Sequence, residues 1–237
     1  MIRFEQVNKH FGKLHALRNV SLNCEAGQCI ALVGPNGCGK TTLFKSILGL
    51  VVPDSGDISF DGSTLIRSHL YRSRIGYMPQ IGRYPSNLSI GQLIYLIRQL
   101  REEETQADLE LLEEYHLESM FEKPMRSLSG GTIQKVSATI AFMFNPSVLI
   151  LDEPTAGLDP LASEILKEKI KKELAKGKLI IISSHLLNEL DELATQVIYM
   201  QEGEIKYHRD ITELKEITGE TMLSKAVVRM LKQASYV

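Results

Sequence analysis

A glycine-rich segment of the chain has the residue types that hold a phosphate group. It reads Gly34-Pro35-Asn36-Gly37-Cys38-Gly39-Lys40-Thr41, which fits the pattern G-x-x-x-x-G-K-[ST], and Thr42 follows it. Glycine backbone can curl so that successive N–H groups point at one anion. We expect Lys40 to reach the β- and γ-phosphates of a nucleotide and the Thr41 hydroxyl to be a ligand of Mg²⁺. The loop alone does not distinguish a kinase, a GTPase, a motor or a transporter ATPase.

A pair of acids follows a short apolar run later in the chain. Asp152 and Glu153 come directly after Val148-Leu149-Ile150-Leu151, which predicts a buried strand. Ligands of open α/β sheets bind beyond the carboxyl ends of the strands. We therefore expect Asp152 to hold Mg²⁺, directly or through a water, and Glu153 to polarise an attacking water as a catalytic base. Without the phosphate loop, the pair would read as two solvated acids.

A second segment could bind an anion in the same physical way. Ser129-Gly130-Gly131 follows Leu128 and opens a predicted helix that runs to Phe144. The free N–H groups at a helix N-terminus favour a phosphate. The alternative is a plain N-cap by the Ser129 hydroxyl, and on the segment alone that alternative is the simpler one.

Strands and helices must position these residues, and their order predicts an α/β fold. The phosphate loop stands between a predicted buried strand at 29–33 and a predicted helix at 41–48. From Pro146 onward, apolar strand-length runs alternate with amphipathic helices, which is typical of a parallel sheet covered by helices. The first 28 residues read as short strands with period-two alternation, and 57–62 reads as a strand with a hairpin turn.

A helical insertion interrupts this pattern. Apolar residues recur at helical spacing from Ser89 to Leu117, and two short amphipathic helices are expected at 212–217 and 223–232. We predict an ATPase-type core at 1–82 and 133–207, an α-helical subdomain at 83–132 and a C-terminal helical tail at 208–237.

Composition limits the classes of partner. The chain has 237 residues, of which 43% are hydrophobic and 24% charged, and a net charge of −2. This balance gives no global electrostatic reason to expect nucleic acid. No apolar run approaches the roughly 20 residues that span a bilayer, and the first residues lack a signal-peptide pattern. Cys24, Cys29 and Cys38 do not form a paired framework, which fits reduced thiols, and the spacing of the first two matches no standard zinc site, so we expect these two to be core residues. Cys38 lies inside the phosphate loop, and two alternatives stay open for it: a thiol whose modification blocks ATP binding, or a buried, inert one.

The order and spacing of the motifs resemble those of the ATP-binding subunits of ATP-binding cassette (ABC) transporters over nearly the whole chain. The phosphate loop, the Ser-Gly-Gly signature segment and the acid pair stand in the order of that family. The resemblance also assigns an aromatic residue that stacks on adenine, a Q-loop glutamine, a D-loop aspartate and a switch histidine. In this chain they are Phe11, Gln80, Asp159 and His185.

Two positions depart from the family pattern. Thr132 stands where the signature usually continues with glutamine, and Gln134 lies two residues on. The threonine keeps a hydrogen-bonding group near the helix start, but it is shorter. Phe11 replaces the usual tyrosine, which keeps the π-face and loses the hydroxyl. The alternative for Phe11 is a core aromatic.

The resemblance implies a fold, a cofactor and a division of roles. The fold is a P-loop NTPase (RecA-like) core with an antiparallel β-subdomain and an inserted α-helical subdomain, and the cofactors are ATP and Mg²⁺. Glu153, His185 and Gln80 would be catalytic, and Thr41, Gln80 and Asp152 would serve the metal. Two copies, or one copy and a related subunit, would dimerise head to tail, so that Ser129, Gly130 and Gly131 of one bind the γ-phosphate held by residues 34–42 of the other.

A transporter of this family also needs a membrane part. The resemblance implies separate transmembrane permease subunits, which would dock near residues 80–88 and hold this chain at the cytoplasmic face of the membrane. The tail at 211–219 resembles exporter-type ATPases, and residues 129–159 look somewhat like ATPases that serve copper-enzyme (nitrous oxide reductase) maturation. The cargo cannot be read from the chain.

Other classes of ATP-binding protein fit the chain less well. ABC ATPases of DNA repair or chromosome structure share the motifs, but they place long coiled coils between the phosphate loop and the signature segment, and this chain has no such insertion. A translation-associated relative would carry two cassettes. A small-molecule kinase would need neither the Ser129 segment nor the acid pair. A non-enzymatic binding module fits worst, because every catalytic position is filled.

Overall fold

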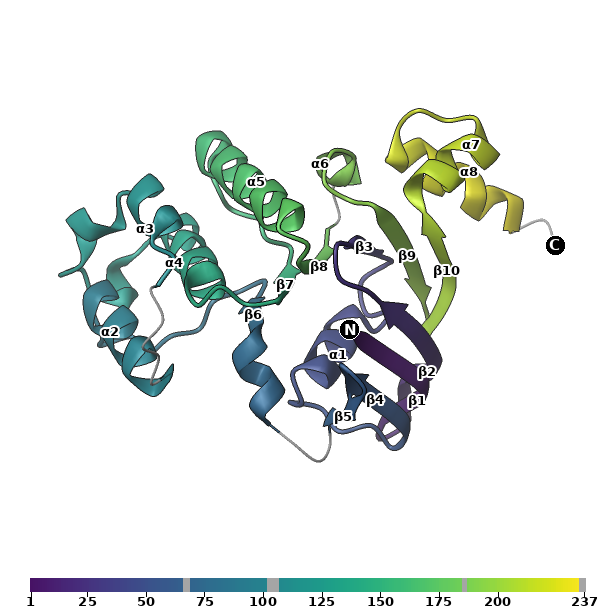
Figure 1. The fold of residues 1–237 in the computed structure, drawn as a ribbon, viewed down its shortest axis with the longest axis horizontal. Coiled ribbons are helices and arrows are strands. Elements are labelled where there is room, and N and C mark those ends of the chain that lie inside the picture. Colours follow the sequence, from purple (N-terminus) through teal and green to yellow (C-terminus); the bar gives the residue numbers. More distant parts are fainter. Residues whose placement is uncertain (66–68, 102–106, 185–186, 235–237) are drawn as a thin grey trace.

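Two β-sheets form the frame of the molecule (Figure 1). The computed structural model describes residues 1–65, 69–101, 107–184 and 187–234. The first sheet has four strands in the order β2-β1-β4-β5, and the second has six in the order β10-β9-β3-β8-β7-β6. The α/β architecture expected from the sequence is confirmed.

The four-stranded sheet is antiparallel and is built from the first part of the chain. Its strands are β1 (Ile2–Phe11), β2 (Leu14–Cys24), β4 (Ser55–Phe60) and β5 (Ser63–Thr64). The register pairs Phe4 of β1 with Leu22 on one side and Ile58 on the other, and all three side chains are buried. The alternation of apolar and polar residues along β1 and β2 therefore places one face of this sheet in a core.

The six-stranded sheet carries the carboxyl ends at which ligands are expected. Its strands are β3 (Cys29–Val33), β6 (Ile75–Met78), β7 (Val148–Asp152), β8 (Leu179–Ser183), β9 (Gln196–Gln201) and β10 (Glu204–Asp210). Neighbouring strands from β6 to β9 are parallel, and only β10 runs antiparallel, as a hairpin with β9. Every residue of β3, β7 and β8 is buried, as continuous apolar runs predict for parallel strands covered on both faces.

Helices cover the sheet and extend the molecule at both ends. They are α1 (Lys40–Ile47), α2 (Ile90–Arg101), α3 (Glu110–Glu114), α4 (Gly130–Met143), α5 (Pro160–Ala175), α6 (Leu187–Leu190), α7 (Ile211–Thr218) and α8 (Leu223–Ala234), with short 3₁₀ helices at Leu70–Arg74, Leu117–Met120 and Met125–Ser127. In Figure 1, α2, α3 and α4 lie at the left end of the molecule, whereas α7 and α8 lie at the upper right. The expected helical insertion and tail are thus present as helices, and their boundaries as domains stay a prediction.

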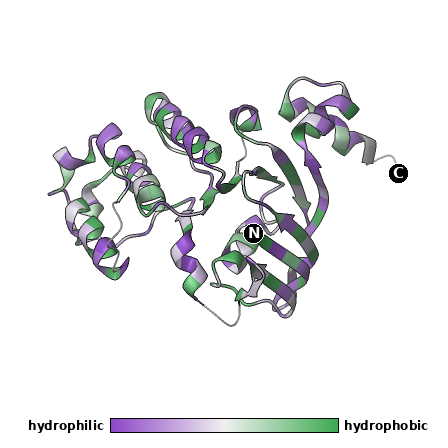
Figure 2. Cartoon of the chain, in the orientation of Figure 1, coloured by the Kyte–Doolittle hydropathy of each residue, from purple (hydrophilic) through white to green (hydrophobic). Residues whose placement is uncertain are grey.

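Two hydrophobic clusters lie on opposite faces of the six-stranded sheet. Along β3, Ile30 and Leu32 join the cluster that contains α1 and the antiparallel sheet, while Cys29, Ala31 and Val33 join the cluster that contains α4 and α5. Figure 2 shows hydrophobic and hydrophilic residues recurring along α5, which packs one side onto the second cluster. The strand before the phosphate loop is therefore fixed from both sides.

The cysteines behave as core residues. Cys24 and Cys29 belong to different clusters, and burial raises the pKa of each thiol to about 12. Such thiols stay protonated and unreactive. Among the described residues, no group of three or more His, Cys, Asp or Glu side chains is arranged to hold a metal ion.

Candidate functional site

A cavity of about 400 Å³ lies where the phosphate loop meets the carboxyl ends of the parallel strands. The residues that line it come from β1, β2, the phosphate loop, α1, and the ends of β6 and β7. They are Phe11, Leu14, Ala16, Asn36, Gly37, Gly39, Lys40, Thr41, Thr42, Gln80, Asp152 and Glu153. Residues predicted from three separate motifs thus meet around one space.

The phosphate loop wraps around the Lys40 ammonium. Lys40 is 8% exposed, and its Nζ donates to the carbonyl oxygens of Gly34 at 2.7 Å and Pro35 at 3.1 Å. Gly39 has φ +113°, and a Cβ there would lie 2.5 Å from the carbonyl oxygen of Ala16, so only glycine allows this approach. The ammonium therefore carries its positive charge beside neutral carbonyls rather than beside a carboxylate.

The N-terminus of α1 also favours an anion. The helix begins at Lys40 with no side-chain cap at Gly39 and no acid in its first turn. The first N–H groups of a helix have no partner inside the helix, and they carry the positive end of its dipole. Together with Lys40 they form a cradle for phosphate oxygens.

Both acids are held by Ser183 of the neighbouring strand, one through its side chain and the other through its backbone. Asp152 ends β7 at 5% exposure and accepts a hydrogen bond from the Ser183 hydroxyl of the neighbouring strand β8. Glu153 has φ +50°, and its backbone N–H is held by the carbonyl oxygen and the hydroxyl of Ser183, both at 3.1 Å. A left-handed backbone costs about 1 kcal/mol or more for a residue other than glycine, and such strain collects at functional sites. Ser183 holds both acids, and sequence analysis missed it because a strand serine carries no motif.

Gln80 contacts Glu153 from the end of the neighbouring strand β6. It follows β6, and its Nε2 donates to Glu153 Oε2 at 2.8 Å. Because the amide nitrogen is engaged, the amide oxygen is the atom that can face a cation.

The donor set fits Mg²⁺. A hydroxyl, a carboxylate and an amide oxygen, from Thr41, Asp152 and Gln80, line the same cavity. These hard oxygen donors suit Mg²⁺, which keeps several waters and is shared with substrate phosphates. The residues present are therefore those that would hold the ion beside a bound nucleotide.

Phe11 lies at the rim of the cavity rather than in a core. Its side chain is 49% exposed, and the Lys9 ammonium stands 5.6 Å from the centre of its ring. The core-aromatic alternative is therefore excluded, and one face of the ring is open to a planar group. Leu14 and Ala16 line the cavity beside it, and both were missed because isolated apolar residues in a strand carry no signal of their own.

The Ser129 segment does not line this cavity. The Ser129 hydroxyl accepts from the backbone N–H of Thr132 at 3.2 Å and lies 2.8 Å from the Thr132 hydroxyl, so within the chain it caps α4. A Cβ at Gly131 would lie 2.7 Å from the carbonyl oxygen of Gly157. Asp159 caps α5 and pairs with Lys135 at 2.7 Å, and the hydrogen bond from Lys135 lowers the pKa of its carboxyl.

Three residues of the phosphate loop that were predicted to bind the nucleotide do not line the cavity. Gly34 and Pro35 contribute carbonyl oxygens to Lys40 but do not line the cavity, and Cys38 is 3% exposed beneath the loop. His185 lies outside the described residues.

Comparisons with known proteins agree with this geometry. A family model described as ABC transporter matches residues 17–156. The Nod factor export ATP-binding protein I of Burkholderia lata is 35% identical over 207 residues, which are 85% of this chain and 68% of that protein. A lantibiotic transport ATP-binding protein of Streptococcus pyogenes is 35% identical over 205 residues, which are 86% of this chain and 89% of that protein.

Solved structures give the same result. A structure described as the ATP-binding subunit of an ABC transporter superposes with a TM-score of 0.89 at 27% identity, covering 98% of this chain and 99% of the other. A dimeric ATP-binding cassette in a post-hydrolysis state, bound to ADP and Pi, superposes with a TM-score of 0.80 at 25% identity, covering 89% of this chain and 98% of the other.

Proposed function

The chain belongs to the ABC transporter family as an ATP-binding subunit and ATPase whose cofactors are ATP and Mg²⁺, and from this premise we propose that two copies close head to tail on ATP and drive separate membrane permease subunits. The observation that carries the proposal is the single cavity that joins Lys40 and Thr41 to Asp152 and Glu153. Within this cavity, Lys40 and the N-terminus of α1 suit phosphates, and Glu153 is the group suited to activate water.

Each residue has a role that its contacts support. Lys40 and the first N–H groups of α1 hold the phosphates, and Phe11 offers its exposed ring to the adenine base. Glu153 orients or deprotonates the attacking water, and Gln80 holds the Glu153 carboxylate. Mg²⁺, held by Thr41, Asp152 and Gln80, would neutralise charge on the phosphates. The role of His185 rests on the family resemblance alone.

Closure of two copies explains why the Ser129 segment stands apart from the cavity. In the proposed dimer, Ser129, Gly130 and Gly131 of one copy contact the γ-phosphate held by the other. Closure then depends on the γ-phosphate, so hydrolysis removes a bridging charge and favours the open state. The Asp159–Lys135 pair ties the segment that follows the acids to α4, the helix that begins with the Ser129 segment.

The membrane partner and the direction of transport are proposals of the same kind. Among the helices that the structure describes, none has the length and apolar character to cross a bilayer. We infer that separate permease subunits dock near residues 80–88 and hold the chain at the cytoplasmic face of the membrane. The name of one relative, a Nod factor export ATP-binding protein, favours export, and neither that name nor the name of the lantibiotic transport relative favours the copper-enzyme type.

The test is the Glu153→Gln variant, which keeps the shape of the side chain and removes its basicity. We expect the variant to bind ATP as tightly as the wild type, to lose at least about 100-fold in ATP turnover, and to form a stable dimer in ATP with Mg²⁺. Size-exclusion chromatography with and without ATP, together with phosphate release, measures all three. A wild-type rate of phosphate release in the variant contradicts the proposal.

A second measurement separates transport from action on nucleic acid. ATPase activity is compared with added DNA, with added RNA and with a detergent-solubilised membrane protein that co-purifies with this chain. Stimulation by that membrane protein alone supports the proposal, and stimulation by nucleic acid alone favours the rival class.

A further inference from the structure

The segment from Gln80 to Tyr84 is fastened along one side of α4. Gln134 Nε2 donates to the carbonyl oxygen of Gln80 at 3.3 Å, and one turn later the Ser137 hydroxyl accepts from the Tyr84 hydroxyl at 2.9 Å. Residues three apart on a helix share a face, so both contacts lie on the same side of α4. The backbone between them is close as well, because a Cβ at Gly82 would lie 2.4 Å from the Ser137 hydroxyl oxygen.

Gln134 is placed to transmit small movements of this helix. It is 5% exposed, and a buried side-chain amide is costly to leave without an acceptor, which here is the Gln80 carbonyl oxygen. It stands about one turn inside α4, whose N-terminus is formed by Ser129, Gly130 and Gly131. A single rigid helix therefore carries both the segment that would meet another copy's nucleotide and the donor that holds Gln80.

The other side of Gln80 reaches the catalytic acid. Its backbone accepts from Gln134, and its side chain donates to Glu153 Oε2 at 2.8 Å. The Glu153 backbone is itself fixed by two hydrogen bonds to Ser183. A shift of Gln80 is therefore passed to the Glu153 carboxylate and not to its backbone.

We propose that Gln134 is a positioning residue that connects the N-terminus of α4, through Gln80, to the Glu153 carboxylate of the same chain. The proposal rests on the proposed function, in which the Ser129 segment contacts the nucleotide of a second copy. When that nucleotide binds, its contacts with the Ser129 segment shift α4, and Gln80 moves with the helix because Gln134 holds its carbonyl oxygen. Occupancy of one ATP site thereby sets the direction of Glu153 in the other, which is a coupling between the two sites.

The test replaces Gln134 by methionine, which has nearly the same length and volume but no donor. We expect kcat for ATP to fall about tenfold while the Kd for ATP changes by less than about twofold, because ground-state binding is untouched and the base is misplaced. The Hill coefficient for ATP hydrolysis should fall toward 1, since the coupling path is broken.

A matched control is Thr139→Val on the same helix. Thr139 is 1% exposed, and its hydroxyl donates to the carbonyl oxygen of Lys135 inside α4, with no contact to Gln80. This variant also loses a buried polar group at constant shape, and it should keep the wild-type kcat and Hill coefficient. Equal losses in both variants, or an unchanged kcat and Hill coefficient in Gln134→Met, would overturn the proposal.

A second readout does not depend on hydrolysis. Hydrogen–deuterium exchange of the amides of residues 81–84 should become at least about fivefold faster in Gln134→Met and stay unchanged in Thr139→Val, because only the first variant removes one of the two hydrogen bonds that fasten the segment to α4. Unchanged exchange in Gln134→Met overturns the positioning role. If the wild type shows no ATPase activity but exchange is still faster in Gln134→Met, the proposed function is refuted, while the link from α4 to Gln80 through Gln134 stands.

Discussion

Two buried lysines of this chain have opposite surroundings. Lys169 of α5 is 2% exposed, and its ammonium contacts Asp108 at 2.5 Å, Glu110 at 2.7 Å and Glu173 at 3.1 Å. Lys40 of the phosphate loop is 8% exposed and contacts backbone carbonyl oxygens instead. Within the described part of the chain, no carboxylate lies within ion-pair distance of Lys40.

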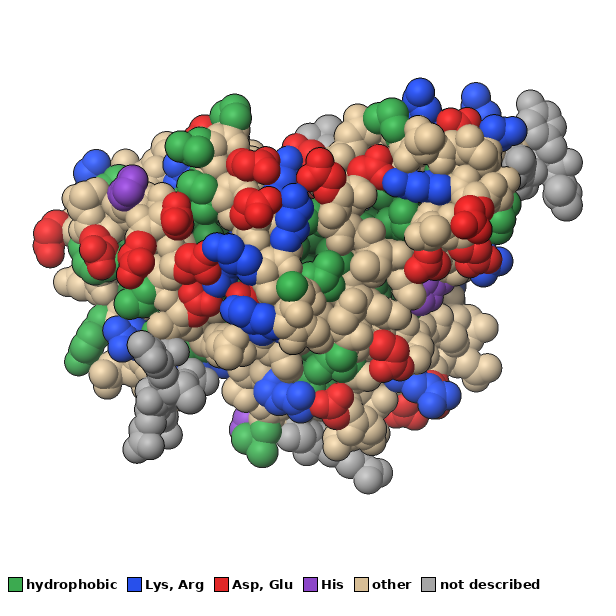
Figure 3. Space-filling model, turned by 45° about the horizontal axis from the view of Figure 1, so that its top comes forward, with side chains coloured by type: hydrophobic (Ala, Val, Ile, Leu, Met, Phe, Trp, Pro, Cys, Tyr) green, Lys and Arg blue, Asp and Glu red, His purple; other side chains and the backbone are tan. Residues whose placement is uncertain are grey.

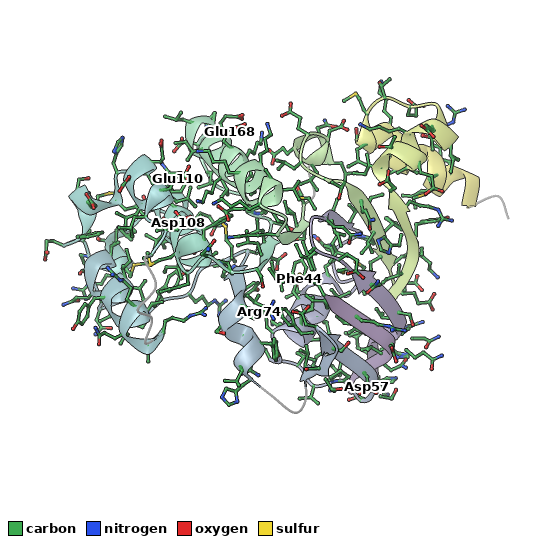
Figure 4. All side chains as sticks on the ribbon, viewed as in Figure 1. Phe44, Asp57, Arg74, Asp108, Glu110 and Glu168 are labelled. Carbon is green, nitrogen blue, oxygen red and sulfur yellow. The ribbon has the colours of Figure 1, made fainter. Side chains whose placement is uncertain are left out.

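The difference separates a lysine that holds the fold together from one kept for a ligand. Burial lowers the pKa of Lys169, but the hydrogen bonds to its three carboxylates outweigh burial and raise the pKa above its ordinary value. In Figure 4, Asp108 and Glu110 lie beside α5, and Figure 3 shows acidic and basic side chains next to one another on the surface of the molecule. The positive charge of Lys169 is balanced by carboxylates of the protein itself. The positive charge of Lys40 is available to pair with the phosphates of a bound ligand.

The largest effect is expected from Lys169→Met. The substitution removes the cation shared by Asp108, Glu110 and Glu173. Because Glu173, which is 1% exposed, keeps its contacts with Lys176 and Lys178, the cost lies at the low end for a buried ion pair broken from one side, about 3 kcal/mol. We expect the free energy of unfolding to fall by that amount, while the folded protein binds ATP with unchanged affinity. Urea unfolding and ATP titration measure the two quantities. A loss of ATP affinity in the folded variant would break the comparison.

The next effect is expected from Lys40→Met. No carboxylate loses its partner there, so the free energy of unfolding should change by less than about 1 kcal/mol. The Kd for ATP should rise about 100-fold, which corresponds to about 2.7 kcal/mol of lost phosphate binding. Calorimetric titration with ATP checks the affinity, and the same urea experiment checks the fold. A variant whose free energy of unfolding falls by several kcal/mol while its Kd for ATP stays unchanged would reverse the assignment of the two lysines.

The smallest effect is a dependence of stability on pH that arises from Glu173, one of the three carboxylates around Lys169. Burial raises the pKa of Glu173, but hydrogen bonds from Lys176, Lys178 and Lys169 outweigh burial and lower the pKa to about 2. The depressed value adds stability above the ordinary pKa of about 4.5, and this stability is lost as pH falls from about 4.5 to about 2.

The lost stability should be on the order of 2 kcal/mol, because water reaches part of the cluster and weakens the pairs. The Glu173→Gln variant should start less stable and show a flatter decline over the same range of pH. Thermal unfolding of both proteins from pH 5 to pH 2.5 measures the two slopes. Equal slopes would show that protonation of Glu173 does not cause the loss of stability at low pH.

The phosphate site could be predicted from the sequence because its parts are local. Lys40 and Thr41 lie within one eight-residue pattern, and Asp152 and Glu153 follow one apolar strand. The parallel sheet then brings them together, since strands that share a direction end at the same edge.

The rest depends on contacts between residues far apart in the sequence. Asp108 and Glu110 look like solvated acids, and nothing near them points to Lys169 about 60 positions away. Gln134 and Ser183 act through single hydrogen bonds that no spacing encodes. The Ser129 segment was predicted to bind a nucleotide of a second copy, and one chain by itself shows only its role as a helix cap.

The left-handed backbone at Glu153 has a consequence for how this protein can be engineered. Glycine or asparagine would adopt φ +50° at lower energy, so selection for heat resistance alone would favour them at this position. Such a protein would melt later, bind ATP and fail to turn it over. Position 153 is thus a place where screens for stability and screens for activity select opposite residues.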